Sequence, residues 1–148
     1  MTAPTTLYTI GFTKKSAETF FGLLREAGVR RVIDVRLNNT SQLAAFAKKD
    51  DLAFFLGELG GIEYLHVPEM APTQELVDLA RKKKDRDAFE ERYRALIEER
   101  EVELLLPRET LDRACLLCSE HRPRGCHRRV LAEYLAGRLG DVRIEHLL

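Results

Sequence analysis

The stretch CLLCSEHRPRGCHRRVLAEYL, residues 115–135, decides the fold, because it joins an expected strand to an expected helix through a loop of reactive side chains. The apolar run from Ala114 to Leu117 is too short for a helix and suits a buried strand. Helical spacing then recurs at Val130, Leu131, Tyr134, Leu135 and Leu139. Residues 118–129 contain four Arg and one Glu, a local charge of +3 with His neutral. We expect any chemistry of this chain in that loop.

Length and composition narrow the class of protein. A chain of 148 residues predicts one domain, residues 1–148, long enough to bury a core. Its formal net charge of zero argues against a protein that binds nucleic acid through bulk charge. Three cysteines, two of them in one loop, do not match a secreted disulfide framework. The first residues carry no signal-peptide pattern and no apolar run has membrane-spanning length, so we expect a cytoplasmic protein with no membrane partner.

The order of the expected elements predicts an α/β domain with a largely parallel sheet. Strands are expected at residues 6–10, 31–36, 62–67, 114–118 and 142–147. Helices are expected from the cap Ser16 to Gly28, over 51–59, and from the loop after the fourth strand to Gly140. A charged helical tract over 75–106, broken near Asp85, forms an insertion before the fourth strand. Short strand–helix–strand joins imply parallel pairing with right-handed crossovers.

Polar and reactive residues follow the ends of the first four expected strands. They are Thr13, Asp34 with Arg36, His66, and Cys118 with Glu120. A strand period of two places Asp34 and Arg36 on the same side. Open parallel sheets bind ligands beyond the carboxyl ends of their strands, so we expect all of these residues in one site at that edge.

Four segments carry a resemblance to a known family. They are T-I-G-x-T at 9–13, V-I-D-V-R at 32–36, Y-x-H-x-P at 64–68 and L-L-C-S-E-x-x-P-x-x-C-H-R at 116–128. Together they resemble the domain of unknown function 488 family over nearly the whole chain. The resemblance implies a Rossmann-like fold and no settled activity. Its motif positions are Thr13, Asp34, Arg36, His66, Cys118, Glu120, Cys126, His127 and Arg128.

One segment departs from the family pattern. Many members follow the D-V-R strand with a Pro-x-Ser-Arg loop, whereas this chain has Leu37-Asn38-Asn39-Thr40-Ser41-Gln42. The departure removes one expected cation. The full expectation for the fold is a three-layer Rossmann-like α/β domain with a largely parallel sheet of about five strands and a helical insertion before the fourth.

Cys118 is the candidate nucleophile. It leaves a buried strand for a loop that is rich in Arg and leads to a helix N-terminus, and both features lower a thiol pKa. Cys118 and Arg124 also have the Cys-x5-Arg spacing of cysteine phosphatases, and the strand–loop–helix setting resembles that of rhodaneses. Pro123 lacks an N–H for a phosphate cradle, and the carboxylate of Glu120 would oppose an anion. The alternative is an inert cysteine at the end of a strand.

The first turn of the last helix is the candidate anion site. Cys126, His127 and Arg128 are expected there, where free N–H groups and the helix dipole attract phosphate. Arg36 and Arg128 are expected to point into one cleft and to clamp an anion between them. The alternative is that Arg128 forms a structural ion pair with Asp34 or Glu120.

Metal and redox chemistry are further alternatives. Cys118, Cys126, His127 and His66 are suitable ligand types, but Cys-x7-Cys-His is not a recognised zinc spacing. We therefore predict no metal and no cofactor. A reversible disulfide between Cys118 and Cys126 stays open.

These interpretations combine into two functional hypotheses. The first is a cysteine-dependent transferase or hydrolase that acts on a phosphate-bearing small molecule or nucleotide. Its catalytic candidates are Cys118, Glu120, His66 and Asp34, and its anion-binding candidates are Thr13, Arg36, Cys126, His127 and Arg128. The second is a non-catalytic module that binds nucleotide or nucleic acid with the same Arg and His side chains.

Overall fold

A computed structural model describes residues 4–12, 15–37, 49–82, 85–118 and 127–148 of the chain. Its strands are β1 Thr5–Gly11, β2 Arg31–Asp34, β3 Glu63–His66, β4 Ala114–Cys118 and β5 Val142–Leu147. Its helices are α1 Ala17–Ala27, α2 Lys49–Gly60, α3 Gln74–Lys82, α4 Arg86–Glu99, α5 Arg108–Leu111 and α6 His127–Leu139. Short 3-10 turns cover Pro68–Met70 and Val102–Leu104.

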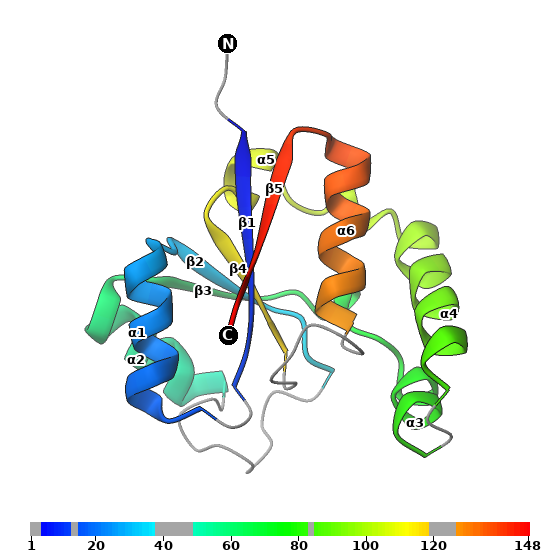
Figure 1. Cartoon of the computed structure of the whole chain (residues 1–148), viewed down its shortest axis with the longest axis horizontal. Coiled ribbons are helices and arrows are strands. Elements are labelled where there is room, and N and C mark those ends of the chain that lie inside the picture. The colour runs from blue at the N-terminus through cyan, green and yellow to red at the C-terminus, as the bar shows by residue number, and fades with distance from the viewer. Residues whose placement is uncertain (1–3, 13–14, 38–48, 83–84, 119–126) are drawn as a thin grey trace.

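The five strands form one parallel sheet in the order β3-β2-β4-β1-β5. Helices α1 and α2 cover one face, and α6 covers the other together with the α3–α4 insertion (Figure 1). The α/β class, the parallel sheet and the three layers predicted from the sequence are therefore confirmed. Because every strand runs in the same direction, all five carboxyl ends lie at one edge of the sheet.

Strand β4 is the centre of the core. All five of its side chains are buried, and they alternate between the two faces as a strand period of two requires. Leu116 packs on the α6 side, whereas Cys115 and Leu117 pack on the α1–α2 side. Cys115 is thus a core residue, as its place in the apolar run predicted.

Several element boundaries follow from local chemistry, as the sequence predicted. The Ser16 hydroxyl accepts the N–H of Thr19 and caps α1, and Gly28 ends that helix with φ of 75°. The Asp85 carboxylate accepts the N–H of Ala88, so the break in the charged tract lies where expected.

Two predicted boundaries were wrong. Strand β2 ends at Asp34, so Arg36 follows the strand instead of closing it. The charged tract is helical only to Glu99, because Glu101 takes a left-handed conformation with φ of 49°. Beyond it the chain continues through a 3-10 turn and the short α5, where Arg108 donates hydrogen bonds to the carbonyl groups of Leu139 and Gly140.

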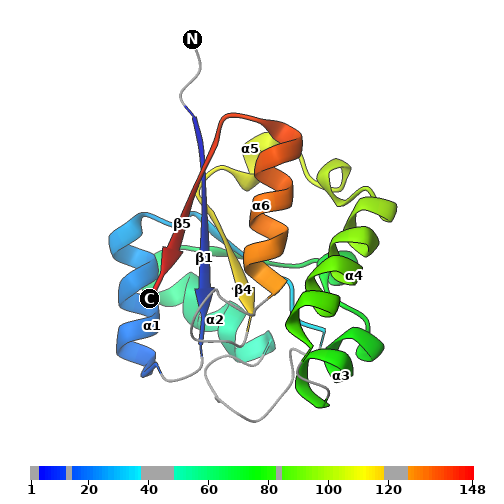
Figure 2. The same cartoon turned by 45° about the vertical axis from the view of Figure 1, so that its right-hand side comes forward.

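The insertion packs firmly on the α6 face of the sheet (Figure 2). Phe89, Tyr93 and Ile97 of α4 are buried there, as their helical spacing predicted. The Tyr93 ring stacks on Phe89 with 5.8 Å between centroids, and its hydroxyl donates to the carbonyl oxygen of Met70 at 2.5 Å. None of the helices in the described part of the chain has both the length and the apolar character needed to cross a membrane.

The Tyr93 hydroxyl gives a test of this packing. Tyr93→Phe should lower the free energy of unfolding by about 1–3 kcal/mol, because it leaves the buried Met70 carbonyl without its donor. Urea denaturation followed by circular dichroism measures the loss. Leu104→Ala is the control, since that side chain is 74% exposed and its loss should cost almost nothing. Equal stability of Tyr93→Phe and the wild-type protein would contradict this account of the insertion.

Candidate functional site

The structure brings the described candidate residues to the carboxyl edge of the sheet. Asp34, His66 and Cys118 end the neighbouring strands β2, β3 and β4, and His127 and Arg128 open α6. The candidates Thr13, Glu120 and Cys126 lie outside the described residues. The location of the other candidates agrees with the rule for parallel sheets, while their roles stay predictions.

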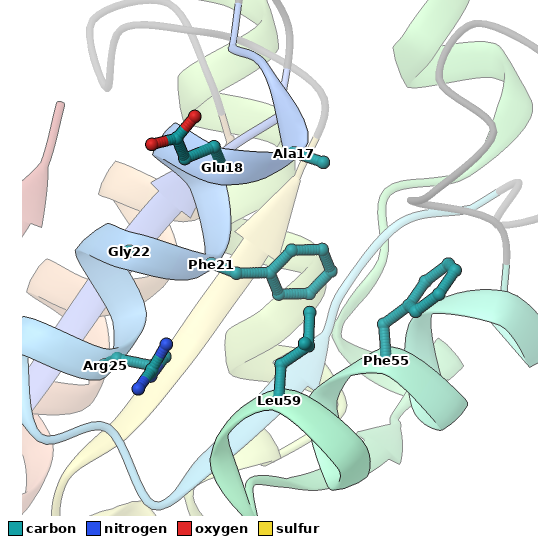
Figure 3. Close-up of a pocket in the computed structure, with 7 residues that line it drawn as sticks. All are labelled: Ala17, Glu18, Phe21, Gly22, Arg25, Phe55 and Leu59. Carbon is teal, nitrogen blue, oxygen red and sulfur yellow. The ribbon is translucent and has the colours of Figure 1, made fainter.

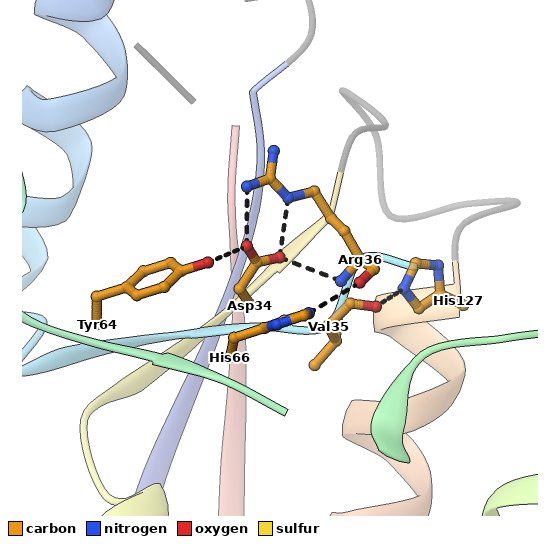
Figure 4. A network of polar contacts seen from close by, with 6 residues as sticks. All are labelled: Asp34, Val35, Arg36, Tyr64, His66 and His127. Carbon is orange, nitrogen blue, oxygen red and sulfur yellow. Dashed lines mark hydrogen bonds and ion pairs between the residues drawn. The ribbon is translucent and has the colours of Figure 1, made fainter. Parts of the chain in front are cut away.

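An ion pair between Asp34 and Arg36 occupies the α1–α2 side of this edge (Figure 4). Arg36 donates from Nε to Oδ1 and from NH2 to Oδ2, both at 2.8 Å, and its backbone N–H also bonds Oδ1. The Tyr64 hydroxyl donates to Oδ2 at 2.5 Å. The Arg36 guanidinium lies over the Phe12 ring, 5.4 Å from its centroid. Both members of the pair are buried, so its geometry is fixed from several sides.

This ion pair changes the predicted role of Arg36. A bidentate carboxylate largely neutralises its charge, so Arg36 alone is a weaker attractor of anions than a solitary cation. Its NH1 group makes no hydrogen bond to any described residue, so NH1 can donate to a ligand. The expected clamp around a shared anion therefore loses most of the charge that Arg36 was to supply.

A second polar cluster lies on the α6 side of the same edge. Arg128 is fully buried and donates from NH1 to the Cys118 sulfur at 3.0 Å and from Nε to the Thr9 hydroxyl at 3.3 Å. The Thr9 oxygen lies 2.5 Å from Nδ1 of His146. Thr9 and His146 are register partners on β1 and β5, so the cluster draws on three strands and the first turn of α6.

The direction of these hydrogen bonds follows from the chemistry of Arg. A guanidinium only donates, so the Thr9 oxygen accepts a hydrogen bond from Arg128. The Thr9 hydroxyl can in turn donate a hydrogen bond to Nδ1 of His146. Nδ1 accepts this hydrogen bond in the tautomer that carries the ring proton on Nε2. Burial, and next the positive charge of Arg128, lower the pKa of His146, which keeps its ring neutral at pH 7. The pKa of Lys15 is also lowered, first by burial and then by Arg128.

Sequence reasoning missed Thr9, Lys15 and His146. The strand-end rule was applied to the first four strands only, and its extension to the fifth would have found His146. Thr9 begins the T-I-G-x-T segment but was not taken as a site residue, because a β-branched residue inside a strand ordinarily belongs to the core. Lys15 lies just before a helix, where a lysine is usually exposed.

The two described cysteines differ in state. Cys115 is a free thiol, and burial raises its pKa well above the ordinary value although Arg128 and Lys15 oppose this. Cys118 is disulfide-bonded and fully buried. A disulfide sulfur is no nucleophile, so the predicted role of Cys118 requires that it first be reduced.

Two histidines bind the backbone at the end of β2 (Figure 4). Nε2 of His127 lies 2.7 Å from the Val35 carbonyl oxygen, and Nε2 of His66 lies 3.3 Å from that of Arg36. Burial lowers the pKa of His127 to about 4, with the Val35 carbonyl opposing and Arg128 adding to the shift. A neutral His127 donates Nε2–H to Val35 and so links α6 to β2. Within the described residues, no group of three or more His, Cys, Asp or Glu is arranged to hold a metal ion.

Comparison with known proteins identifies the family. The family model described as "Domain of unknown function DUF488" matches residues 16–135, most of the chain, so the protein belongs to this family. No curated protein and no solved structure matches the chain. The predicted resemblance is confirmed, and the family itself specifies no reaction.

Neutral His127 should make stability depend on pH. Its pKa is about 4 in the folded protein and about 6.5 when unfolded, so the unfolded chain binds the proton first as pH falls. The contribution is fully present above pH ~6.5 and is lost towards pH ~4, a change of about 1–3 kcal/mol. Urea titrations between these values should show a smaller pH dependence for His127→Gln than for the wild type. Identical pH dependence in both proteins would contradict a buried neutral His127.

The Asp34 pair gives a second test of the site. Asp34→Asn should cost about 3–5 kcal/mol of stability, because it leaves the buried charge of Arg36 without its carboxylate. Tyr64→Phe removes one of the hydrogen bonds to Asp34 and should cost less, about 1–3 kcal/mol. Chemical denaturation of both variants gives the comparison. A loss below 1 kcal/mol for Asp34→Asn would mean that the pair is well solvated.

Proposed function

We propose that this protein is a cysteine-dependent enzyme that acts on a phosphate-bearing small molecule or nucleotide, with reduced Cys118 as the nucleophile. One observation carries the proposal: the fully buried guanidinium of Arg128 donates a hydrogen bond to the Cys118 sulfur at 3.0 Å. A cation held this close in a desolvated site favours the thiolate over the thiol. Once Cys118 is reduced, the same contact would stabilise its thiolate at neutral pH, which supports the proposal.

The chemistry is that of a transferase or hydrolase with a covalent intermediate. The Cys118 thiolate bonds to the electrophilic centre of the substrate, and the leaving group departs with its electron pair and takes up a proton. Glu120 or His66 supplies that proton in this proposal, and Asp34 acts by holding Arg36. Water or a second substrate then releases the group from sulfur.

Several cations support binding of a phosphate. Arg128 and Lys15 bring positive charge to the carboxyl edge, the NH1 group of Arg36 offers a donor, and the first turn of α6 presents its N–H groups. Thr13, Cys126 and His127 are the other proposed anion contacts. No metal or cofactor enters the proposal.

The proposal sets a condition on location. Cys118 must be a thiol during catalysis, and the cytoplasm is the compartment that keeps thiols reduced. We therefore propose a cytoplasmic protein, whose Cys118 disulfide is a resting form.

A non-catalytic module that binds nucleotide or nucleic acid is the second candidate. The disulfide and complete burial of Cys118 favour it, because a binding protein needs the cations and not a reactive sulfur. Thiol reactivity separates the two candidates.

The nucleophile should be detected by alkylation of the reduced protein. With iodoacetamide and peptide mass mapping, Cys118 should react with a midpoint well below pH 8, against about 8.5 for an ordinary thiol. Cys115 is an internal control and should stay unmodified, because it packs inside β4 on the α1–α2 side and burial raises the pKa of its thiol. Cys118 is buried as well, but it ends β4 at the carboxyl edge, where Arg128 donates to its sulfur. A midpoint at or above about 8.5 for Cys118 would favour the binding module.

Substitution of Arg128 tests the cause of that reactivity. Arg128→Met should raise the Cys118 midpoint by about one pH unit or more, because the stabilising charge is lost. Arg128→Lys keeps a positive charge, so it should raise the Cys118 midpoint by less than Arg128→Met does. It also provides a measurement if Arg128→Met fails to fold. Arg129→Met is the matched control, since Arg129 ion-pairs with Glu90 and Glu133 and should leave the midpoint unchanged. Equal midpoints in all the variants would reject Arg128 as the activating group.

A further inference from the structure

An apolar groove of about 390 Å³ lies between α1 and α2 (Figure 3). Its lining consists of Ala17, Glu18, Phe21, Gly22 and Arg25 of α1 with Phe55 and Leu59 of α2. Figure 3 shows Phe21 pointing from α1 towards Leu59 and Phe55 on α2, so these three side chains form its apolar floor. The carboxyl-edge site uses none of these residues.

Large apolar side chains extend the groove onto the outer surface of α2. Phe54 is 61% exposed and Leu59 is 47% exposed. Neither side chain has a polar atom, so burial against a partner would break no hydrogen bond. The Phe55 ring lies 5.7 Å from Phe54 and 6.0 Å from Phe21, which makes a continuous row of rings from α2 to α1. A contiguous apolar surface of this kind on a small domain marks an interaction site.

The glycine in the lining gives further support. A Cβ added at Gly22 in α1 would meet none of its described neighbours within 4 Å, and Gly22 does not have a positive φ. Glycine weakens a helix interior, so packing and backbone conformation inside this chain give no reason for it. The absent side chain of Gly22 instead leaves room for another backbone to approach α1 closely.

The charges around the groove indicate the kind of occupant. Among the described side chains beside the groove, Glu18, Asp51 and Glu58 are exposed carboxylates and Arg25 is a cation. Asp51, Phe54, Phe55, Glu58 and Leu59 share one face of α2, because they recur at helical spacing. A two-fold pairing of this surface with itself would bring like charges together, which disfavours a second copy of the chain.

We propose that the α1–α2 groove binds an amphipathic helix of a partner protein, with large apolar side chains on one face and Lys or Arg beside them. The apolar anchors fill the groove over Phe21, Phe55 and Leu59, as in other helix-in-groove complexes. The partner's cations meet Glu18, Asp51 and Glu58, and its backbone passes over Gly22. The function of this surface is independent of the chemistry of Cys118.

A synthetic peptide tests the proposal on the full-length chain. The probe is a labelled helical peptide of about 15 residues with Leu at i, i+3, i+4 and i+7 and Lys beside them, and its partner probe has Glu for each Lys. Fluorescence anisotropy should show that the Lys peptide binds at least about tenfold more tightly than the Glu peptide. Equal affinity for the two peptides would overturn the proposal.

A matched pair of glycine variants localises the binding. Gly22→Leu fills the groove and should weaken binding of the Lys peptide by about tenfold or more. Gly137→Leu is the control, because Gly137 lies in α6 and also has no atom within 4 Å of an added Cβ. Both variants should melt at the wild-type temperature or about 2–4 °C above it, because leucine favours a helix more than glycine does. Such a melting temperature shows that the variant folds. Phe54→Ser, at an exposed position, should also weaken binding.

Three results would reject the proposal. Equal affinity of the Gly22→Leu and Gly137→Leu variants would place the peptide elsewhere. Unchanged affinity in Phe54→Ser would exclude the exposed row of rings. Dimerisation of the wild-type chain that Gly22→Leu abolishes, without binding of either peptide, would assign the groove to a second copy.

Discussion

The buried guanidinium of Arg128 is the constraint on which the carboxyl edge of this protein depends. A charged group that is buried must form hydrogen bonds or ion pairs. The described contacts of Arg128 are hydrogen bonds to the sulfur of Cys118 and the hydroxyl of Thr9. Those contacts tie the first turn of α6 to β4 and β1, and the Thr9 hydroxyl carries the connection on to His146 of β5. Burial is the main cause that lowers the pKa of Lys15, His127 and His146, and the charge of Arg128 acts in the same direction on all three. One side chain thereby connects α6 with three strands at this edge.

The opposite side of the same edge is built around a carboxylate. Asp34 accepts hydrogen bonds from Arg36 and Tyr64, and Phe12 packs on the guanidinium. His127 joins the two sides, because it starts on α6 beside Arg128 and reaches the Val35 carbonyl after β2. A neutral pair on one side and a buried cation on the other produce an asymmetric site. Cysteine chemistry in the proposed function belongs to the cationic side.

The fold was largely predictable because its signals are local. Short apolar runs, the caps at Ser16 and Asp85, and the glycine after α1 depend on residues close in sequence, and each was found where expected. The end of the charged tract was not predictable, since Leu104 and Leu105 continue an apolar pattern without being buried. There the chain turns at Glu101, and long-range hydrogen bonds from Arg108 hold the following segment.

The sequence by itself determined that Asp34, His66 and Cys118 end at one edge of the sheet, because parallel strands place their ends together whatever their order. Only the tertiary structure decided the partners of each polar group. Arg36 binds Asp34, two residues before it, although it was expected to bind an anion. Arg128 binds Cys118 and Thr9, because the crossover to α6 places its first turn beside β4 and β1. His146 joins Arg128 for the same reason: β5 pairs with β1, a contact between segments 137 residues apart. Sequence spacing carries no information about such a contact, since it exists only once the chain has folded.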